Sequence, residues 1–124
     1  MEIVSLNEIP MEPRLPPMHI GEVESQNLVP DSEQTAIGIL HFSKGARNRL
    51  HTHLVDQVLV VTAGEGIVAT DKEERTVTVG DVIVFPAGEK HWHGATKDSG
   101  FSHLFVLRKD FTEEHRAEIV DDQG

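Results

Sequence analysis

Short apolar stretches alternate with turn residues from residue 35 onward. TAIGILHFS (35–43), RLHTH (49–53), QVLVVTAG (57–64) and IVATD (67–71) are strand-like segments. RTVTV (75–79), DVIVF (81–85), HWHGAT (91–96) and FSHLFVL (101–107) continue the series, with glycines, a proline and the polar tip DKEE between segments. About eight strands at regular spacing, with no intervening helix, predict an all-β antiparallel sandwich or barrel.

The two ends of the chain lack this alternation. Residues 1–34 are rich in proline, so we expect an extended N-terminal arm before a barrel over residues 35–108. Because sheet edges need cover, part of the arm around HIGEVES (19–25) is expected to pair with an edge, in the same or a partner subunit. Residues 109–124 form a short acidic tail, in which FTEEHRAEIV (111–120) is a candidate helix.

Charge and composition narrow the function classes. Eleven basic residues against twenty-one acidic ones give a net charge of −10, which argues against nucleic acid or an anionic membrane surface as a partner. The sequence has no cysteine, so any metal would be held by nitrogen and oxygen ligands. The apolar stretches are too short to cross a bilayer, and the first residues do not resemble a signal peptide. We therefore expect a cytoplasmic protein.

Histidine is the residue type with the most suggestive placement. Five of the eight histidines lie between residues 51 and 103. His51 and His53 are two residues apart, so on a strand both imidazoles would point to one face. The pair is a candidate metal-binding element, although an HxH pattern by itself is weak evidence and more often marks structural histidines.

The wider spacing around this pair resembles a known family. Gly45, five residues, His51, one residue, His53, three residues, Gln57, six residues and Gly64 form a first block. Gly80, five residues, Pro86, one residue, Gly88, two residues and His91 form a second block. The two blocks resemble the two cupin motifs in order and separation. This resemblance implies a cupin-type antiparallel β-barrel, also called a double-stranded β-helix or jelly roll, and a homodimer.

The same resemblance implies a metal site. Its ligands would be His51, His53 and His91, and the fourth cupin ligand is normally a glutamate. Gln57 stands at that position, so the fourth ligand is an amide oxygen or is absent, and Ala95 replaces the asparagine that usually ends the second motif.

A finer resemblance links the chain to small single-domain cupins that include metal-dependent hydroxynitrile lyases. It is carried by QVLVVTAGEG, PAGEKHWHGA and SHLFV. Members of that group bind manganese or a related divalent ion through three histidines and a glutamine. One manganese ion per chain is therefore expected, with iron, nickel, zinc and cobalt as alternatives.

A glutamine ligand would change the chemistry of such a site. Three imidazoles and an amide are all neutral, so the metal complex keeps its full +2 charge and should attract an anionic or carbonyl-containing small molecule. Glutamine cannot carry a proton at neutral pH. The lyase-like resemblance places a functional histidine at His93 and at His103, and Lys90 is a candidate for attracting anions at the pocket mouth.

Strand alternation also predicts the pocket wall. The expected lining residues are Gly38, Leu40, Phe42, Leu59, Val61 and Leu107. The leading functional hypothesis is a Lewis-acid lyase acting on a carbonyl or cyanohydrin-like substrate. The alternatives are an isomerase of sugar-derived carbonyl compounds, a dioxygenase, and a non-catalytic binding or sensor protein.

Overall fold

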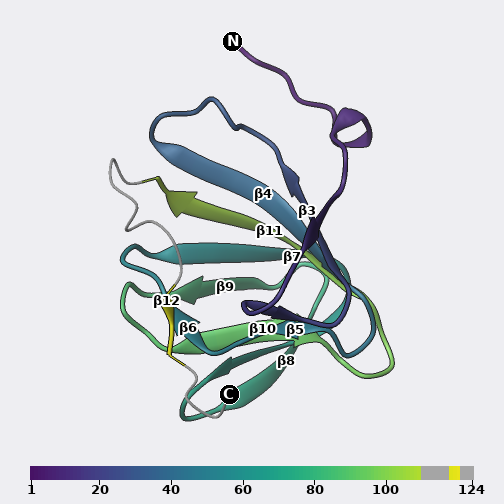
Figure 1. The fold of residues 1–124 in the computed structure, drawn as a ribbon, viewed down its shortest axis with the longest axis vertical. Coiled ribbons are helices and arrows are strands. Elements are labelled where there is room, and N and C mark those ends of the chain that lie inside the picture. Colours follow the sequence, from purple (N-terminus) through teal and green to yellow (C-terminus); the bar gives the residue numbers. More distant parts are fainter. Residues whose placement is uncertain (110–117, 121–124) are drawn as a thin grey trace.

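Two antiparallel sheets share one long strand, β7 (Gln57–Thr70), and enclose the core (Figure 1). The structure, a computed structural model, describes residues 1–109 and 118–120. The first sheet contains β1 (Glu12–Arg14), β3 (Val23–Asn27), β4 (Thr35–Phe42), β11 (Phe101–Arg108), the first half of β7 and β9 (Val82–Phe85). The second contains β8 (Glu74–Thr78), the second half of β7, β10 (His91–Ala95), β5 (Arg47–Asn48), β6 (His51–Thr52), β2 (His19–Ile20) and β12 (Glu118–Ile119).

This nearly closed barrel confirms the predicted all-β fold. The core is built from inward-facing residues of both sheets, among them Phe42, Leu59, Val61, Phe85 and Phe101. Alternation along β7 explains this, since Leu59 and Val61 are almost fully buried while Val58 and Val60 are partly exposed.

The course of β7 differs from the sequence-based expectation. The sequence pattern separates QVLVVTAG (57–64) from IVATD (67–71), but one strand continues through Gly64 and Gly66. Gly64 has a φ of 74°, and a Cβ there would lie 1.9 Å from the carbonyl oxygen of Gly100. Gly66 lies against the ring of Phe101. The glycines therefore let β7 bend from one sheet into the other.

The N-terminal arm is tied to both sheets. After a short 3-10 helix, η1 (Leu6–Glu8), β1 pairs with β3, β3 pairs with β4, and β2 pairs with β5. The HIGEVES segment thus pairs with sheet edges as expected, and it does so within the same chain. Figure 1 shows this purple segment passing from β3 toward β5. Its path brings residues 12–20 to one end of the barrel.

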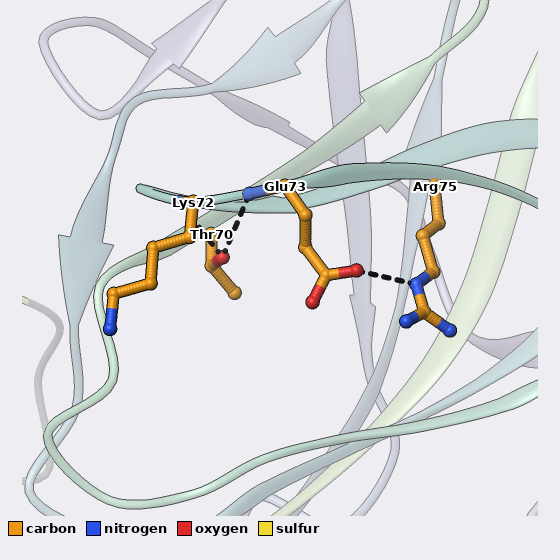
Figure 2. A network of polar contacts seen from close by, with 4 residues as sticks. All are labelled: Thr70, Lys72, Glu73 and Arg75. Carbon is orange, nitrogen blue, oxygen red and sulfur yellow. Dashed lines mark hydrogen bonds and ion pairs between the residues drawn. The ribbon is translucent and has the colours of Figure 1, made fainter.

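The polar DKEE tip forms a compact turn between β7 and β8 (Figure 2). The Thr70 hydroxyl accepts hydrogen bonds from the backbone N–H groups of Lys72 and Glu73, at 3.1 and 3.3 Å. Arg75 and Glu73 form an exposed ion pair at 2.6 Å. This tip takes no part in the histidine cluster described below.

The C-terminal helix expected over residues 111–120 falls largely outside the described residues. Within them, Glu118 and Ile119 form β12, which pairs with β6. Among the described residues, no helix is long and apolar enough to cross a membrane.

Candidate metal centre

Two neighbouring strands and the start of β7 bring the candidate ligands together. His51 on β6 is the direct register partner of His91 on β10. His53 follows β6, and its ring centroid lies 5.0 Å from that of His51 and 5.3 Å from that of His91. Gln57 opens β7 and is buried. The predicted ligand residues are therefore gathered at one place inside the barrel.

Backbone carbonyls fix which nitrogen of two histidines carries the proton. His51 Nδ1 lies 2.5 Å from the Arg49 carbonyl oxygen, and His91 Nδ1 lies 2.9 Å from that of Glu89. A carbonyl oxygen can only accept, so both Nδ1 atoms must donate. In a neutral ring, Nε2 then keeps its lone pair. This arrangement is typical of metal-binding histidines.

The donor atoms of His91 and Gln57 fit a shared cation. His91 Nε2 and Gln57 Oε1 are 3.2 Å apart and buried. With the His91 proton on Nδ1, both atoms are acceptors, and two facing lone pairs repel each other. A divalent cation bound to both would turn this repulsion into attraction, so the donor set fits a metal of the nitrogen- and oxygen-binding class.

Burial keeps the imidazoles neutral. It lowers the pKa of His51, although the hydrogen bond to Arg49 opposes that shift. Burial, together with the nearby His51, lowers the pKa of His91 to about 3. Both rings are therefore unprotonated at neutral pH. Neutral imidazole is the form that binds a metal.

His93 belongs to a separate hydrogen-bonded chain. Its Nε2 lies 3.2 Å from the Asn48 amide nitrogen, and its Nδ1 lies 3.2 Å from His103 Nε2. His103 Nδ1 faces the carbonyl oxygen of Leu104 at 3.4 Å. One assignment satisfies all three contacts: Asn48 donates to His93, His93 donates from Nδ1 to His103, and His103 donates to Leu104. Burial lowers the pKa of His103 to about 4 and that of His93 well below its ordinary value.

Within the described part of the chain, His51, His91 and His93 place one ligand nitrogen each within 4.8 Å of one another. Three histidines could thus hold one metal ion. This trio and the set predicted from the motifs both contain His51 and His91. The trio adds His93, whereas the motif set adds His53. Both ring nitrogens of His93 have hydrogen-bond partners, Asn48 and His103.

A cavity of about 160 Å³ opens beside these residues. Its lining comprises Arg14, Met18, His19, Leu40, Asn48, His51, His53, Gln57, His93, Phe105 and Leu107. A larger hollow of about 870 Å³ elsewhere on the surface contains none of the candidate ligands. The chemistry therefore places the site at the smaller cavity.

The predicted pocket residues divide into three groups. Leu40 and Leu107 line the cavity. Phe42, Leu59 and Val61 lie one layer deeper, in the core. Gly38 lies under the ring of Phe105, because a Cβ there would be 2.6 Å from Phe105 Cζ.

Of the three candidate catalytic residues, one lines the cavity. His93 lines the cavity, and His103 reaches it only through His93. Lys90 is exposed between β9 and β10 and is not among the lining residues.

The sequence reading missed several lining residues. Asn48 is buried, and its Oδ1 accepts the backbone N–H of His93 at 2.8 Å. In the sequence, the one feature that links Asn48 to the site is its position three residues before His51. Arg14, Met18 and His19 come from the arm, and no local pattern marks them as site residues.

Comparison with known proteins settles the family. A cupin domain model matches residues 38–107. This chain belongs to the cupin family. It is 40% identical over 81 residues to an (R)-mandelonitrile lyase from Granulicella tundricola, a match that covers 64% of this chain and 62% of that protein. The match thus spans less than two thirds of the relative's length, and the chain is a small cupin that resembles the hydroxynitrile lyase-like group.

Solved structures support the same fold. A cupin-like protein from Thermotoga maritima is 28% identical, covers 94% of this chain and 88% of its own, and has a TM-score of 0.82. A polyketide cyclase from Streptomyces resistomycificus is 17% identical, with coverage of 97% and 85% and a TM-score of 0.84. Because the polyketide cyclase is only 17% identical, its similarity to this chain concerns the cupin fold alone.

Proposed function

We propose that this cupin is a metal-dependent lyase acting on a carbonyl or cyanohydrin-like substrate. The observation that carries the proposal is the buried pair of acceptors, His91 Nε2 and Gln57 Oε1, at 3.2 Å. His51 and His53 would complete the ligand set, and manganese is the proposed ion. The similarity to a mandelonitrile lyase supports the reaction type.

The ligand residues determine the charge of the site. Three neutral imidazoles and the neutral Gln57 amide leave the +2 charge of a divalent ion uncompensated. Such an ion would supply Lewis-acid stabilisation of negative charge that develops on a substrate oxygen or on a cyanide-like leaving group. The surrounding Leu40, Phe105 and Leu107 limit the water around that charge, which strengthens electrostatic interactions.

Proton transfer falls to His93 and His103. His93 lines the cavity, so its Nε2 can exchange the Asn48 amide for a substrate hydroxyl and accept the hydroxyl proton. His93 Nδ1–H lies 3.2 Å from His103 Nε2. When His93 Nε2 gains the substrate proton, His103 can accept the proton that His93 carries on Nδ1. Burial lowers the pKa of both rings and keeps both in the basic form at neutral pH.

Loading with manganese and assay of mandelonitrile cleavage test this function. The parent protein should bind one metal ion per chain by elemental analysis and release benzaldehyde from mandelonitrile. His53→Ala and His91→Ala should lose both metal and activity, whereas His41→Ala should keep both because His41 bonds to Ser102 and Gln26 and is not among the residues that line the cavity. A fully loaded parent without cleavage would contradict the lyase assignment, and dioxygen uptake would favour an oxygenase.

We also propose that the protein acts as a homodimer. The outer face of the first sheet carries two rows of apolar residues, since Val58 pairs with Val84 and Val106, and Val60 pairs with Val82 and Leu104. Val82 and Val84 remain 62% and 55% exposed. An apolar sheet face of this kind suits burial against a second copy. Val82→Lys should yield a monomer in light scattering, whereas Val79→Lys, 59% exposed beyond β8, should not.

A further inference from the structure

The charge of the cavity wall is opposite in sign to that of the whole chain. The sequence holds 21 acidic residues and a net charge of −10, yet among residues 1–109 and 118–120 the eleven that line the cavity include no acidic side chain. Arg14 is the charged side chain of this wall, because burial keeps the lining histidines His19, His51 and His93 neutral. A ligand that enters this cavity therefore meets a locally cationic surface inside an acidic protein.

Arg14 is held in place by the arm. It ends β1, where its register partner is Val23 on β3. Its Nε donates a hydrogen bond at 2.8 Å to the hydroxyl of Ser25, a residue with only 3% exposure. Because Nε is engaged, the guanidinium is oriented while its two terminal nitrogens stay available as donors. The field of Arg14 also reaches the cavity, since burial and then the Arg14 charge lower the pKa of His19 to about 4.

The geometry points to a small carboxylate as the ligand of this cavity, with Arg14 as the partner of its carboxyl group. This inference rests on the proposed function and specifies its substrate class: a compact hydroxy- or oxo-carboxylate whose oxygen at carbon 2 faces the histidines. A guanidinium binds a carboxylate through two parallel hydrogen bonds, which a nitrile or an alcohol cannot match.

Cavity size and lining agree with this class. A volume of about 160 Å³ is below the roughly 300–1,000 Å³ of pockets for drug-sized ligands, so the substrate must be small. Met18, Leu40, Phe105 and Leu107 provide apolar contacts for the carbon skeleton. The polar side chains of the described lining are Arg14 together with the histidines, Asn48 and Gln57.

Calorimetric binding of mandelate and its neutral amide, mandelamide, to the manganese-loaded protein tests the inference. The parent should bind mandelate more tightly than mandelamide. Arg14→Gln should weaken mandelate binding by about 10–100-fold, the loss expected for a charge-assisted hydrogen-bonded pair, and leave mandelamide binding within twofold. Ser25→Ala, which keeps the arginine but removes its anchor, should weaken mandelate binding by a smaller factor.

The matched control is Arg75→Gln, which removes an exposed arginine on β8 that is not among the cavity-lining residues (Figure 2). It should leave both affinities unchanged. Equal mandelate affinity in the parent and in Arg14→Gln would overturn the inference, because the carboxylate would then be bound elsewhere.

Metal content and mandelonitrile cleavage, measured on the same samples, separate this failure from failure of the proposed function. A parent that cleaves mandelonitrile while Arg14→Gln binds mandelate normally would keep the lyase and reject the carboxylate site. A loaded parent that does not cleave mandelonitrile but loses mandelate affinity in Arg14→Gln would reject the lyase and support the carboxylate site.

Discussion

Replacing Asn48 by alanine should destabilise the protein more than any ordinary surface substitution. Asn48 Oδ1 accepts the backbone N–H of His93 at 2.8 Å, and its amide nitrogen lies 3.2 Å from His93 Nε2. Both contacts are buried. A buried N–H left without an acceptor costs about 1–3 kcal/mol, and the second hydrogen bond contributes about 0.5–1.5 kcal/mol. The expected loss of unfolding free energy in Asn48→Ala is therefore about 2–4 kcal/mol.

Urea denaturation of the metal-free protein measures this loss without interference from metal binding. Asn27→Ala is the matched control, since Asn27 is exposed on β3 and should change stability by no more than about 0.5 kcal/mol. A loss below about 1 kcal/mol in Asn48→Ala would refute the assigned hydrogen bonds, because even one unsatisfied buried N–H costs that much.

The same residue should also set the tautomer of His93. In the parent, Asn48 donates to Nε2, so nitrogen-15 NMR of the metal-free protein should show His93 with its proton on Nδ1. Asn48→Asp replaces the donor by an acceptor, so the proton should move to Nε2 while the carboxylate still accepts the backbone N–H of His93. A parent spectrum with the proton on Nε2 would contradict the direction of the chain from Asn48 to His103.

Three further changes test other parts of the site. Gln57→Glu should tighten metal binding and weaken azide binding, because a carboxylate neutralises one unit of the metal charge; metal competition and azide titration measure the two effects. Burial lowers the pKa of His103 to about 4, so the unfolded chain takes up this proton near pH 6.5 and the folded chain only near pH 4. Stability is therefore full above pH 6.5 and should fall by up to about 3 kcal/mol as the pH drops to 4, a loss that His103→Gln should reduce in urea titrations. Gly38→Ala places a methyl group 2.6 Å from Phe105 Cζ and should cost about 1–3 kcal/mol in unfolding free energy through overpacking.

The strands were predictable because short apolar stretches alternate with turn residues along the chain. TAIGILHFS and FSHLFVL became β4 and β11, and these strands pair along their full lengths. The bend within β7 was not predictable, since a glycine at a positive φ serves a turn and a bent strand equally well in a single sequence. What decides between them is the close approach of Gly100 to Gly64, a contact between distant segments.

The candidate site was predictable only in part, for a similar reason. His51, His53, Gln57 and His91 belong to spaced motifs, and a motif can be recognised without a structure. Asn48 belongs to none, and its role follows from two hydrogen bonds to a residue 45 positions away.

The path of the arm explains why family membership alone does not specify a substrate. The cupin model matches residues 38–107, which contain every proposed metal ligand together with His93 and His103. Arg14, Met18 and His19 line the same cavity but lie outside that match. The barrel therefore holds the proposed metal ligands, whereas the wall that would meet the far end of a substrate comes from a segment that the family match does not cover. Two cupins with the same ligand residues but different arms can thus act on different substrates.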